Sequence, residues 1–211
     1  MNKVASEKQG STARLSRKAV GNQLTLPIVR LLTRTSITPN TITWLGFFIS
    51  AGAAALVITD HPFAAGFVVL IGGFFDLLDG ALARYINKTT RFGTVLDSVL
   101  DRFSDAIVLI GILVLYAFGR SFAGIIIAST ALLLSLVVSY IRARAESVGL
   151  ECKVGLFTRP ERVVVLALGL ILSQFAFALF TALMIIAVFS FITVVQRLHY
   201  VQKQAQIDNK Q

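Results

Sequence analysis

The chain has 211 residues, of which 55% are hydrophobic and only 15% are charged. A water-soluble domain of this length needs no such apolar excess for its core, so the composition indicates a protein that is solvated by a lipid bilayer. The formal net charge of +9 does not indicate a nucleic acid partner, because the basic residues sort by membrane side once the apolar segments are drawn. Cys152 is the single cysteine, which excludes an intrachain disulfide.

The N-terminal segment is polar and basic, and it lacks the apolar core and small-residue cleavage site of a signal sequence. Residues 1–20 are predicted to form a tail with little periodic structure. Between residues 21 and 35, several apolar residues share a stretch with Arg30 and Arg34, which favours a short amphipathic helix in the lipid headgroup layer. We therefore expect residues 1–35 to be a cytoplasmic tail with an interfacial helix.

Six apolar runs follow, each approaching the roughly 20 residues that a helix needs to cross the hydrocarbon layer. The predicted spans are residues 41–59, 64–86, 93–117, 121–145, 160–175 and 177–199. The sequence therefore predicts an all-α, polytopic membrane protein with six transmembrane helices and an N-terminal interfacial amphipathic helix. Residues 36–200 form the membrane domain in this prediction, and residues 201–211 form a cytoplasmic C-terminal tail.

Basic residues are unevenly distributed between the two predicted sides of the membrane. They gather before the first span, between the second and third, between the fourth and fifth, and after the sixth, whereas the opposite loops contain only Arg120. By the positive-inside rule, both termini lie in the cytoplasm and the chain is a multi-pass protein of the cell membrane. The acidic segment described next begins where the second span ends, so we expect the active site on the cytoplasmic side as well.

Four aspartates lie around the junction of the second and third spans. Asp76 and Asp79 are three residues apart, and Asp97 and Asp101 are four apart, so each pair shares one helix face. Because a short loop makes the two helices neighbours, the four carboxylates would repel one another unless a cation neutralised them. Hard oxygen ligands suit Mg²⁺ or Mn²⁺, and two ions a few ångströms apart recur in displacement at phosphorus. The alternative is an ion or proton pathway in a metal-coupled transporter.

Small and basic residues accompany the aspartates. Gly80, Ala83 and Gly93 suit close helix packing, but beside the acids they also leave room for a flat base or for the backbone to approach a diphosphate. Arg84 also has two interpretations, as an interfacial residue that snorkels to the headgroups or as a partner for phosphate oxygens.

The acidic segment resembles the signature of a known family. It reads D-x2-D-G-x2-A-R-x8-G-x3-D-x3-D, which is similar to the motif of the CDP-alcohol phosphotransferases. The resemblance implies a homodimeric membrane enzyme that transfers a phosphatidyl-type group from a CDP-linked lipid to an alcohol, with CMP leaving. It also implies that Asp101 is the general base. The implied ligands of two metal ions are Asp76, Asp79, Asp97 and Asp101.

The same resemblance assigns a site for the CDP-linked lipid. The residues that match the nucleotide pocket and the phosphate contact of the family are Gly80, Ala83, Arg84 and Gly93. The residues that resemble a second nucleotide-contacting segment, at the start of the first span, are Pro39, Asn40 and Thr43. Asp105 lies one turn beyond Asp101 and near Arg102 in the helical pattern, so we expect it to brace the motif through an ion pair.

The flanks of the motif point to an acceptor. The third and fourth aspartates continue as Asp97-Ser98 and Asp101-Arg102, where glycerol-phosphate-using relatives usually have Asp-Pro and Asp-Lys. Together with residues 139–146 and 154–164, these flanks resemble the prokaryotic phosphatidylinositol-phosphate synthases, whose acceptor is inositol 3-phosphate. The residues that match their acceptor-phosphate site are Ser139, Arg142, Arg162 and Arg197. Some relatives have lysine at the place of Arg142, which keeps the charge.

This second resemblance implies CDP-diacylglycerol, or an ether-lipid equivalent, as the donor. Glycerol 3-phosphate, and hence a phosphatidylglycerol-phosphate synthase, is the alternative for the acceptor. The cluster of basic residues between the fourth and fifth spans favours a phosphorylated acceptor, because it exceeds what topology requires. Positive-inside bias or contact with anionic headgroups remains an alternative explanation for any single arginine.

Overall fold

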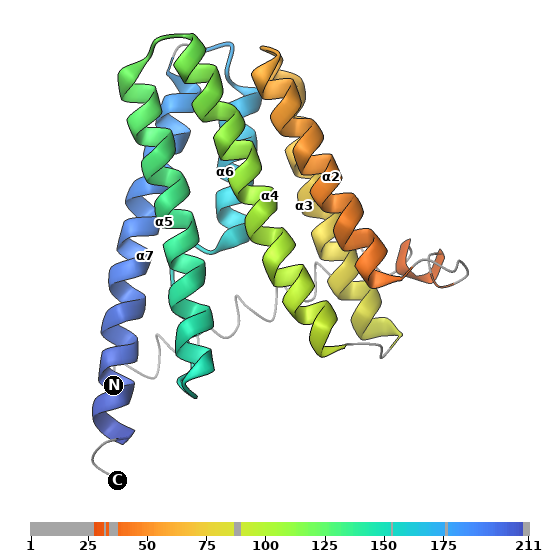
Figure 1. The fold of residues 1–211 in the computed structure, drawn as a ribbon, viewed down its shortest axis with the longest axis vertical. Helices are drawn as coiled ribbons and strands as arrows, with labels where there is room; N and C mark the ends of the chain where they lie inside the picture. The colour runs from red at the N-terminus through yellow and green to blue at the C-terminus, as the bar shows by residue number, and fades with distance from the viewer. Residues whose placement is uncertain are drawn as a thin grey trace, which may run out of the picture.

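The computed structural model describes residues 28–31, 33, 38–86, 90–152, 154–175 and 177–208, and side chains through residue 206. All regular structure in these residues is helical, as the sequence predicts (Figure 1). The long helices are α2 (Pro39–Ile58), α3 (Pro62–Tyr85), α4 (Arg91–Phe118), α5 (Phe122–Ser147), α6 (Arg159–Ile171) and α7 (Ala178–Asp208). Each coincides with one predicted span, and α7 continues into the segment that we expected to be a C-terminal tail.

Four of these helices, α2, α3, α5 and α7, are long and apolar enough to cross a bilayer. The chain is therefore a membrane protein. Two predicted spans differ from this pattern within the described residues. α4 has 28 residues, but its first half is charged. α6 has 13 residues, which at about 1.5 Å per residue is shorter than the roughly 30 Å hydrocarbon layer.

Local capping explains where the helices near the acidic segment begin. Thr90 precedes α4, and its hydroxyl accepts a hydrogen bond from Gly93 N at 2.9 Å. Thr158 precedes α6, and Glu161 completes a capping box by accepting from Thr158 N at 2.9 Å. Both caps satisfy backbone donors that a helix start leaves free. As a result, the first turns of α4 and α6 are fixed where the site lies.

The main packing contacts close the six helices into a ring, in the order α2, α3, α6, α7, α5, α4 and back to α2 (Figure 1). Small residues allow the close approaches. A Cβ on Gly66 of α3 would lie 2.8 Å from Ala167 O of α6, and one on Gly111 of α4 would lie 3.0 Å from Ala54 O of α2. These clashes mean that only glycine permits the observed helix spacing. α3 and α4 both pack on α2, which leaves space between them for a cavity.

The interior of the ring is divided into an apolar end and a polar end. The apolar end is filled by a buried cluster to which all six helices contribute, including Val57, Ala65, Ile112, Ala131, Leu170 and Leu183. The polar end is where α3 ends and α4 and α6 begin. The acidic segment therefore lies at one end of a bundle whose other end is closed by packing.

Part of the expected interfacial helix is described. Residues 28–31 are mostly helical, and Val29 is buried against Ile42, Leu78 and Leu82, whereas Leu31 is exposed. One buried side and one exposed side agree with an amphipathic segment beside the bundle. The rest of that prediction, including the tail of residues 1–20, lies outside the described residues.

Candidate active site

The four signature aspartates line one cavity between α3, α4 and α6, with a volume of about 480 Å³. Asp76 and Asp79 come from the last turns of α3, and Asp97 and Asp101 come from the first turns of α4. The helical spacing of each pair aims both members at the cavity. The structure thus brings together the four acids that the sequence pattern predicted to converge.

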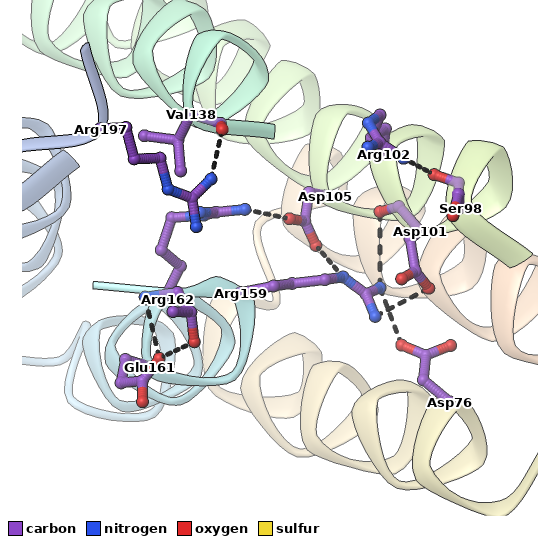
Figure 2. Close-up of polar contacts among 11 residues, drawn as sticks. Asp76, Ser98, Asp101, Arg102, Asp105, Val138, Arg159, Glu161, Arg162 and Arg197 are labelled. Carbon is purple, nitrogen blue, oxygen red and sulfur yellow. Dashed lines mark hydrogen bonds and ion pairs between the residues drawn. The ribbon is translucent and has the colours of Figure 1, made fainter. Parts of the chain in front are cut away.

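Arg159, the first residue of α6, extends into this cavity and pairs with three carboxylates (Figure 2). Its Nη2 lies 2.8 Å from Asp76 Oδ2, its Nη1 lies 2.8 Å from Asp101 Oδ1, and its Nε lies 3.2 Å from Asp105 Oδ1. Nη2 also donates to the Asp101 carbonyl oxygen at 3.4 Å. A single guanidinium therefore joins α6 to both acidic helices. From the sequence, Arg159 was predicted only to be one of the basic residues between the fourth and fifth spans.

Asp105 braces the cluster through ion pairs from α6. Arg162 Nη2 donates to Asp105 Oδ2 at 3.3 Å, and Arg159 Nε donates to Asp105 Oδ1 (Figure 2). The expected bracing role is present, but Arg102, the neighbour expected from the helical pattern, instead donates to the Ser98 carbonyl on its own helix. Asp105 consequently links α4 to the start of α6.

The carboxylates fit a hard divalent cation by their chemistry. Asp79 Oδ2 is buried and accepts no hydrogen bond within the described residues, which is a costly state for a carboxylate oxygen without a cation. No three Asp, Glu, His or Cys side chains in the described part of the chain are arranged to hold a metal ion directly. Arg159 lies against two of the four acids, with a guanidinium nitrogen 2.8 Å from a carboxylate oxygen of Asp76 and another 2.8 Å from one of Asp101.

A second cavity, of about 230 Å³, lies between α2, α3 and α4. It contains every residue that the resemblance assigns to the CDP-linked lipid, namely Pro39, Asn40, Thr43, Gly80, Ala83, Arg84 and Gly93. Gly93 is required for its shape, because a Cβ there would lie 2.9 Å from Thr90 Oγ1 and 3.1 Å from Asn40 Oδ1. The structure therefore gathers these seven residues, although they come from three helices.

The two cavities meet at the acids. Asp79, Gly80, Arg84 and Asp97 line both of them. Away from the acids, the larger cavity has apolar walls of Leu70, Phe74 and Leu77 from α3 and Pro160, Val163 and Val164 from α6. The site thus offers a small polar pocket, an acidic centre and an apolar groove in succession.

Of the residues expected to bind the acceptor phosphate, Arg162 lies in the first turn of α6 and Arg197 contacts the segment before it, whereas Ser139 and Arg142 belong to α5. Arg162 and Arg197 are 5% and 4% exposed, and Arg142 lies in the electrostatic surroundings of Arg197. Each arginine has a partner within the protein: Arg162 pairs with Asp105, Arg142 Nε lies 2.9 Å from Glu146 Oε1, and Arg197 donates to backbone carbonyls. Arg162 Nε is buried and makes no hydrogen bond within the described residues. Ser139 is partly buried.

The connection before α6 is attached to α7. Arg197 Nε donates to Val154 O at 2.9 Å. Its Nη1 donates to Val138 O, within α5 (Figure 2). Phe157 N donates to Thr193 Oγ1 at 3.2 Å. These contacts fix the segment that leads into α6 and hence the starting points of the two arginines that reach Asp105. They also bury Cys152 beside Arg197, and burial raises the pKa of the Cys152 thiol.

Comparison with known proteins identifies the family. The family described as CDP-alcohol phosphatidyltransferase matches residues 36–196, which is most of the chain. The chain belongs to this family. It is therefore a transferase of phospholipid biosynthesis, and the match extends from the start of the predicted membrane domain to within α7.

The similar proteins carry more specific names. Phosphatidylinositol phosphate synthase of Mycobacterium tuberculosis is 43% identical over 194 residues, which cover 89% of each chain. Archaetidylinositol phosphate synthase of Methanothermobacter thermautotrophicus is 35% identical over 182 residues, covering 83% of this chain and 91% of its own.

Solved structures of the Mycobacterium tuberculosis synthase have the same fold. The crystal structure with CDP-DAG bound aligns with a TM-score of 0.78 at 42% identity, covering 85% of this chain and 94% of that chain. The structure in complex with manganese and citrate aligns with a TM-score of 0.77 at 42% identity, covering 84% of this chain and 88% of that chain. The manganese complex shows that a divalent metal binds to this similar synthase.

Proposed function

We propose that the protein transfers a phosphatidyl group from CDP-diacylglycerol, or an ether-lipid equivalent, to inositol 3-phosphate, giving phosphatidylinositol phosphate and CMP. One observation carries the proposal. The polar pocket and the apolar groove share the lining residues Asp79, Gly80, Arg84 and Asp97. In the proposed complex, the nucleotide of the donor lies in the polar pocket and its lipid chains lie in the apolar groove. The diphosphate that joins them then lies beside the shared acids Asp79 and Asp97. The names of the similar synthases support the donor and the acceptor.

We assign Mg²⁺ or Mn²⁺, as two ions, to the carboxylates of Asp76, Asp79, Asp97 and Asp101. The unpartnered Asp79 Oδ2 and the oxygen-only donor set support this assignment. When bound, the cations neutralise the diphosphate and the charge that develops on CMP. The manganese complex of the similar structure supports the class of metal.

Asp101 is the residue that we assign as the general base. Its carboxylate lines the cavity where the diphosphate would lie. It accepts the proton of the acceptor hydroxyl as that oxygen attacks the phosphorus nearest the lipid, and the bond between this phosphorus and the CMP oxygen breaks. Arg84 and the glycine backbone at positions 80 and 93 hold the nucleotide end in place, so the residues act mainly by positioning.

The acceptor phosphate is assigned to the cationic group formed by Ser139, Arg142, Arg162 and Arg197. Arg162 supports this most directly, because its buried Nε makes no hydrogen bond within the described residues. It also lies in the first turn of α6, where the positive end of the helix dipole favours anions. Arg142 pairs with Glu146 and Arg162 pairs with Asp105 in this structure. In the proposed complex, each of these arginines contacts the phosphate as well as its carboxylate.

The topology and assembly also remain proposals. The distribution of basic residues supports a cytoplasmic position for both termini and for the active site. The homodimer implied by the family resemblance stays a prediction.

Incubation of the purified protein with CDP-diacylglycerol and a panel of alcohols, with measurement of CMP, tests the proposal. The panel contains inositol 3-phosphate, free inositol and glycerol 3-phosphate. We expect CMP release to depend on inositol 3-phosphate and Mn²⁺ or Mg²⁺. Preference for glycerol 3-phosphate or free inositol would overturn the acceptor. Ion flux in vesicles without CMP release would instead favour a metal-coupled transporter.

A further inference from the structure

The Arg159 side chain extends between Asp76, Asp101 and Asp105 and lines the cavity that contains the acidic site (Figure 2). Its guanidinium contacts carboxylates from two helices, Asp76 on α3 and both Asp101 and Asp105 on α4. The side chain is 22% exposed, so these charges are only partly screened by solvent. The cation therefore offsets much of the repulsion that the clustered acids would otherwise create.

Two of these contacts use oxygens that the proposed function gives to metal. Asp76 Oδ2 and Asp101 Oδ1 each lie 2.8 Å from an Arg159 nitrogen. A divalent ion bound between the same two oxygens would meet the guanidinium at short range and be repelled by it. This agrees with the finding that no three acidic, His or Cys side chains of the described residues are arranged to hold a metal in this conformation.

The third contact, between Arg159 Nε and Asp105, does not involve a proposed metal ligand, so Arg159 can keep it when a metal ion binds. Nε lies at the base of the guanidinium and donates to Asp105 Oδ1, which belongs to no signature position. Rotation of the side chain about this contact moves both Nη groups away from Asp76 and Asp101. The start of α6 need not move, because Thr158 and Glu161 cap it.

We propose that Arg159 is the internal counter-ion of the acidic site, that it competes with the divalent cation for Asp76 and Asp101, and that Asp105 retains it when the cation binds. The inference rests on the proposed function in taking these two acids as metal ligands. It explains how the site tolerates several partly buried carboxylates before the metal binds. It also makes the affinity for the metal weaker than the carboxylates alone would give.

The test measures binding of Mn²⁺ alone to the purified, chelator-stripped full chain, by calorimetry or by electron paramagnetic resonance. Arg159→Gln removes the competing charge, so we expect the dissociation constant for Mn²⁺ to fall by about tenfold or more, as loss of charge-assisted contacts implies. Arg102→Gln is the matched control, because Arg102 is close to Asp97 but, among the described residues, donates to the Ser98 carbonyl of its own helix and to no carboxylate. We expect a change below about twofold there.

Thermal unfolding supplies a second readout. In chelator, Arg159→Gln should unfold at a lower temperature than the parent because Asp76 and Asp101 lose the cation that pairs with them and Asp105 keeps only Arg162. Saturating Mn²⁺ should raise the unfolding temperature of the variant by more than it raises that of the parent. Arg159→Lys, which keeps the charge but cannot span three carboxylates, should fall between the two in both measurements.

A structure of the parent protein with Mn²⁺ tests the inference without any substitution. We expect the guanidinium to have left Asp76 and Asp101 while Nε remains at Asp105. The inference is overturned by Arg159 still bridging both acids beside a bound ion, by unchanged or weaker Mn²⁺ binding in Arg159→Gln, or by an equal gain in Arg102→Gln.

Failure of the proposed metal site would look different from failure of this inference. In that case the parent would not bind Mn²⁺, or Asp79→Asn would bind it as tightly as the parent does. A parent that binds Mn²⁺ through Asp79 but is insensitive to Arg159 would leave the metal site standing and remove only the competition.

Discussion

Arg159 Nη2 lies 2.8 Å from Asp76 Oδ2, so the first residue of α6 is paired with a carboxylate that the sequence signature assigns to metal. The position of α6 depends in turn on α7, because Arg197 and Thr193 bond to the backbone of the segment before α6. The four signature aspartates therefore come from α3 and α4, but the position of Arg159 beside them depends on α6 and, through the segment before it, on α7. Substitutions in α7 should reach the active site through this segment.

Chelation is the simplest test of the acidic site. Excess chelator should abolish CMP release, because four carboxylates without a divalent cation cannot hold a diphosphate that is also negative. Addition of Mg²⁺ or Mn²⁺ beyond the chelator should restore it, whereas Na⁺ at equal ionic strength should not. Undiminished release in excess chelator would remove the metal from the mechanism.

Asp101→Asn should separate chemistry from binding. Asparagine keeps the size and polarity of the side chain but cannot accept the acceptor proton, so turnover should fall by about 10² to 10⁴-fold. Binding of the CDP-linked lipid should change much less. The comparison is Asp79→Asn, which should weaken metal-dependent nucleotide binding itself. Near-normal turnover in Asp101→Asn would exclude it as the base.

Much of this site was predictable from local spacing. The helical periods of the four aspartates predict two shared faces, and apolar runs of the right length predict the helices that carry them. Arg159 was not predictable in this way, because its contact with Asp105 joins residues 54 positions apart. Such a contact depends on where the start of α6 lies relative to α4, and the sequence contains no local pattern for it.

Arg197 illustrates a second limit of the sequence. The family resemblance predicts it as a ligand of the acceptor phosphate, and the structure adds that its guanidinium donates to the carbonyls of Val154 and Val138. Backbone carbonyls are present at every residue, so no pattern of side chains reveals such partners. The fifth span, residues 160–175, was already the shortest of the six predicted spans, and the helix within it is shorter still, with 13 residues, because the prediction included the turn that follows the helix.

Gly93→Ala should weaken binding of the donor. The added Cβ would lie 2.9 Å from Thr90 Oγ1 and 3.1 Å from Asn40 Oδ1, so the nucleotide pocket must narrow or the cap of α4 must shift. We expect the KM for CDP-diacylglycerol to rise by about tenfold, which corresponds to roughly 1.4 kcal/mol, with little change for the acceptor. Gly52→Ala is the matched control, since a Cβ there meets nothing within 4 Å. Equal effects in both variants would contradict a role for Gly93 in the pocket.

Asp105→Asn should lower the free energy of unfolding of the protein, in addition to any effect on turnover. The substitution leaves Arg159 and Arg162 with less compensation in a largely buried site, and such breaks cost on the order of 3 kcal/mol. Thermal unfolding in chelator should therefore begin at a lower temperature. Asp60→Asn is the control, because Asp60 is exposed at a turn with a φ of 63°, which asparagine also adopts. An unfolding temperature equal to that of the parent would contradict the bracing role.

Arg162 is the residue through which the acceptor can be tested most directly. It lies in the first turn of α6, is 5% exposed and uses Nη2 to hold Asp105 at 3.3 Å. Its Nε remains without a hydrogen bond among the described residues. Arginine can therefore keep its contact with Asp105 and still offer a donor to phosphate, which the single ammonium of lysine cannot do in the same geometry.

Arg162→Lys should raise the KM for inositol 3-phosphate by about tenfold, and Arg162→Ala should raise it further, because charge-assisted hydrogen bonds to the phosphate are lost. The KM for CDP-diacylglycerol should change little, since Arg162 does not line the nucleotide pocket. Arg144→Ala is the control, because Arg144 is an exposed cation on the same connection. Steady-state CMP release at varied acceptor concentration provides the measurement. If Arg162→Ala kept the acceptor KM of the parent, or if Arg144→Ala changed it equally, Arg162 would serve only to hold α6 against Asp105.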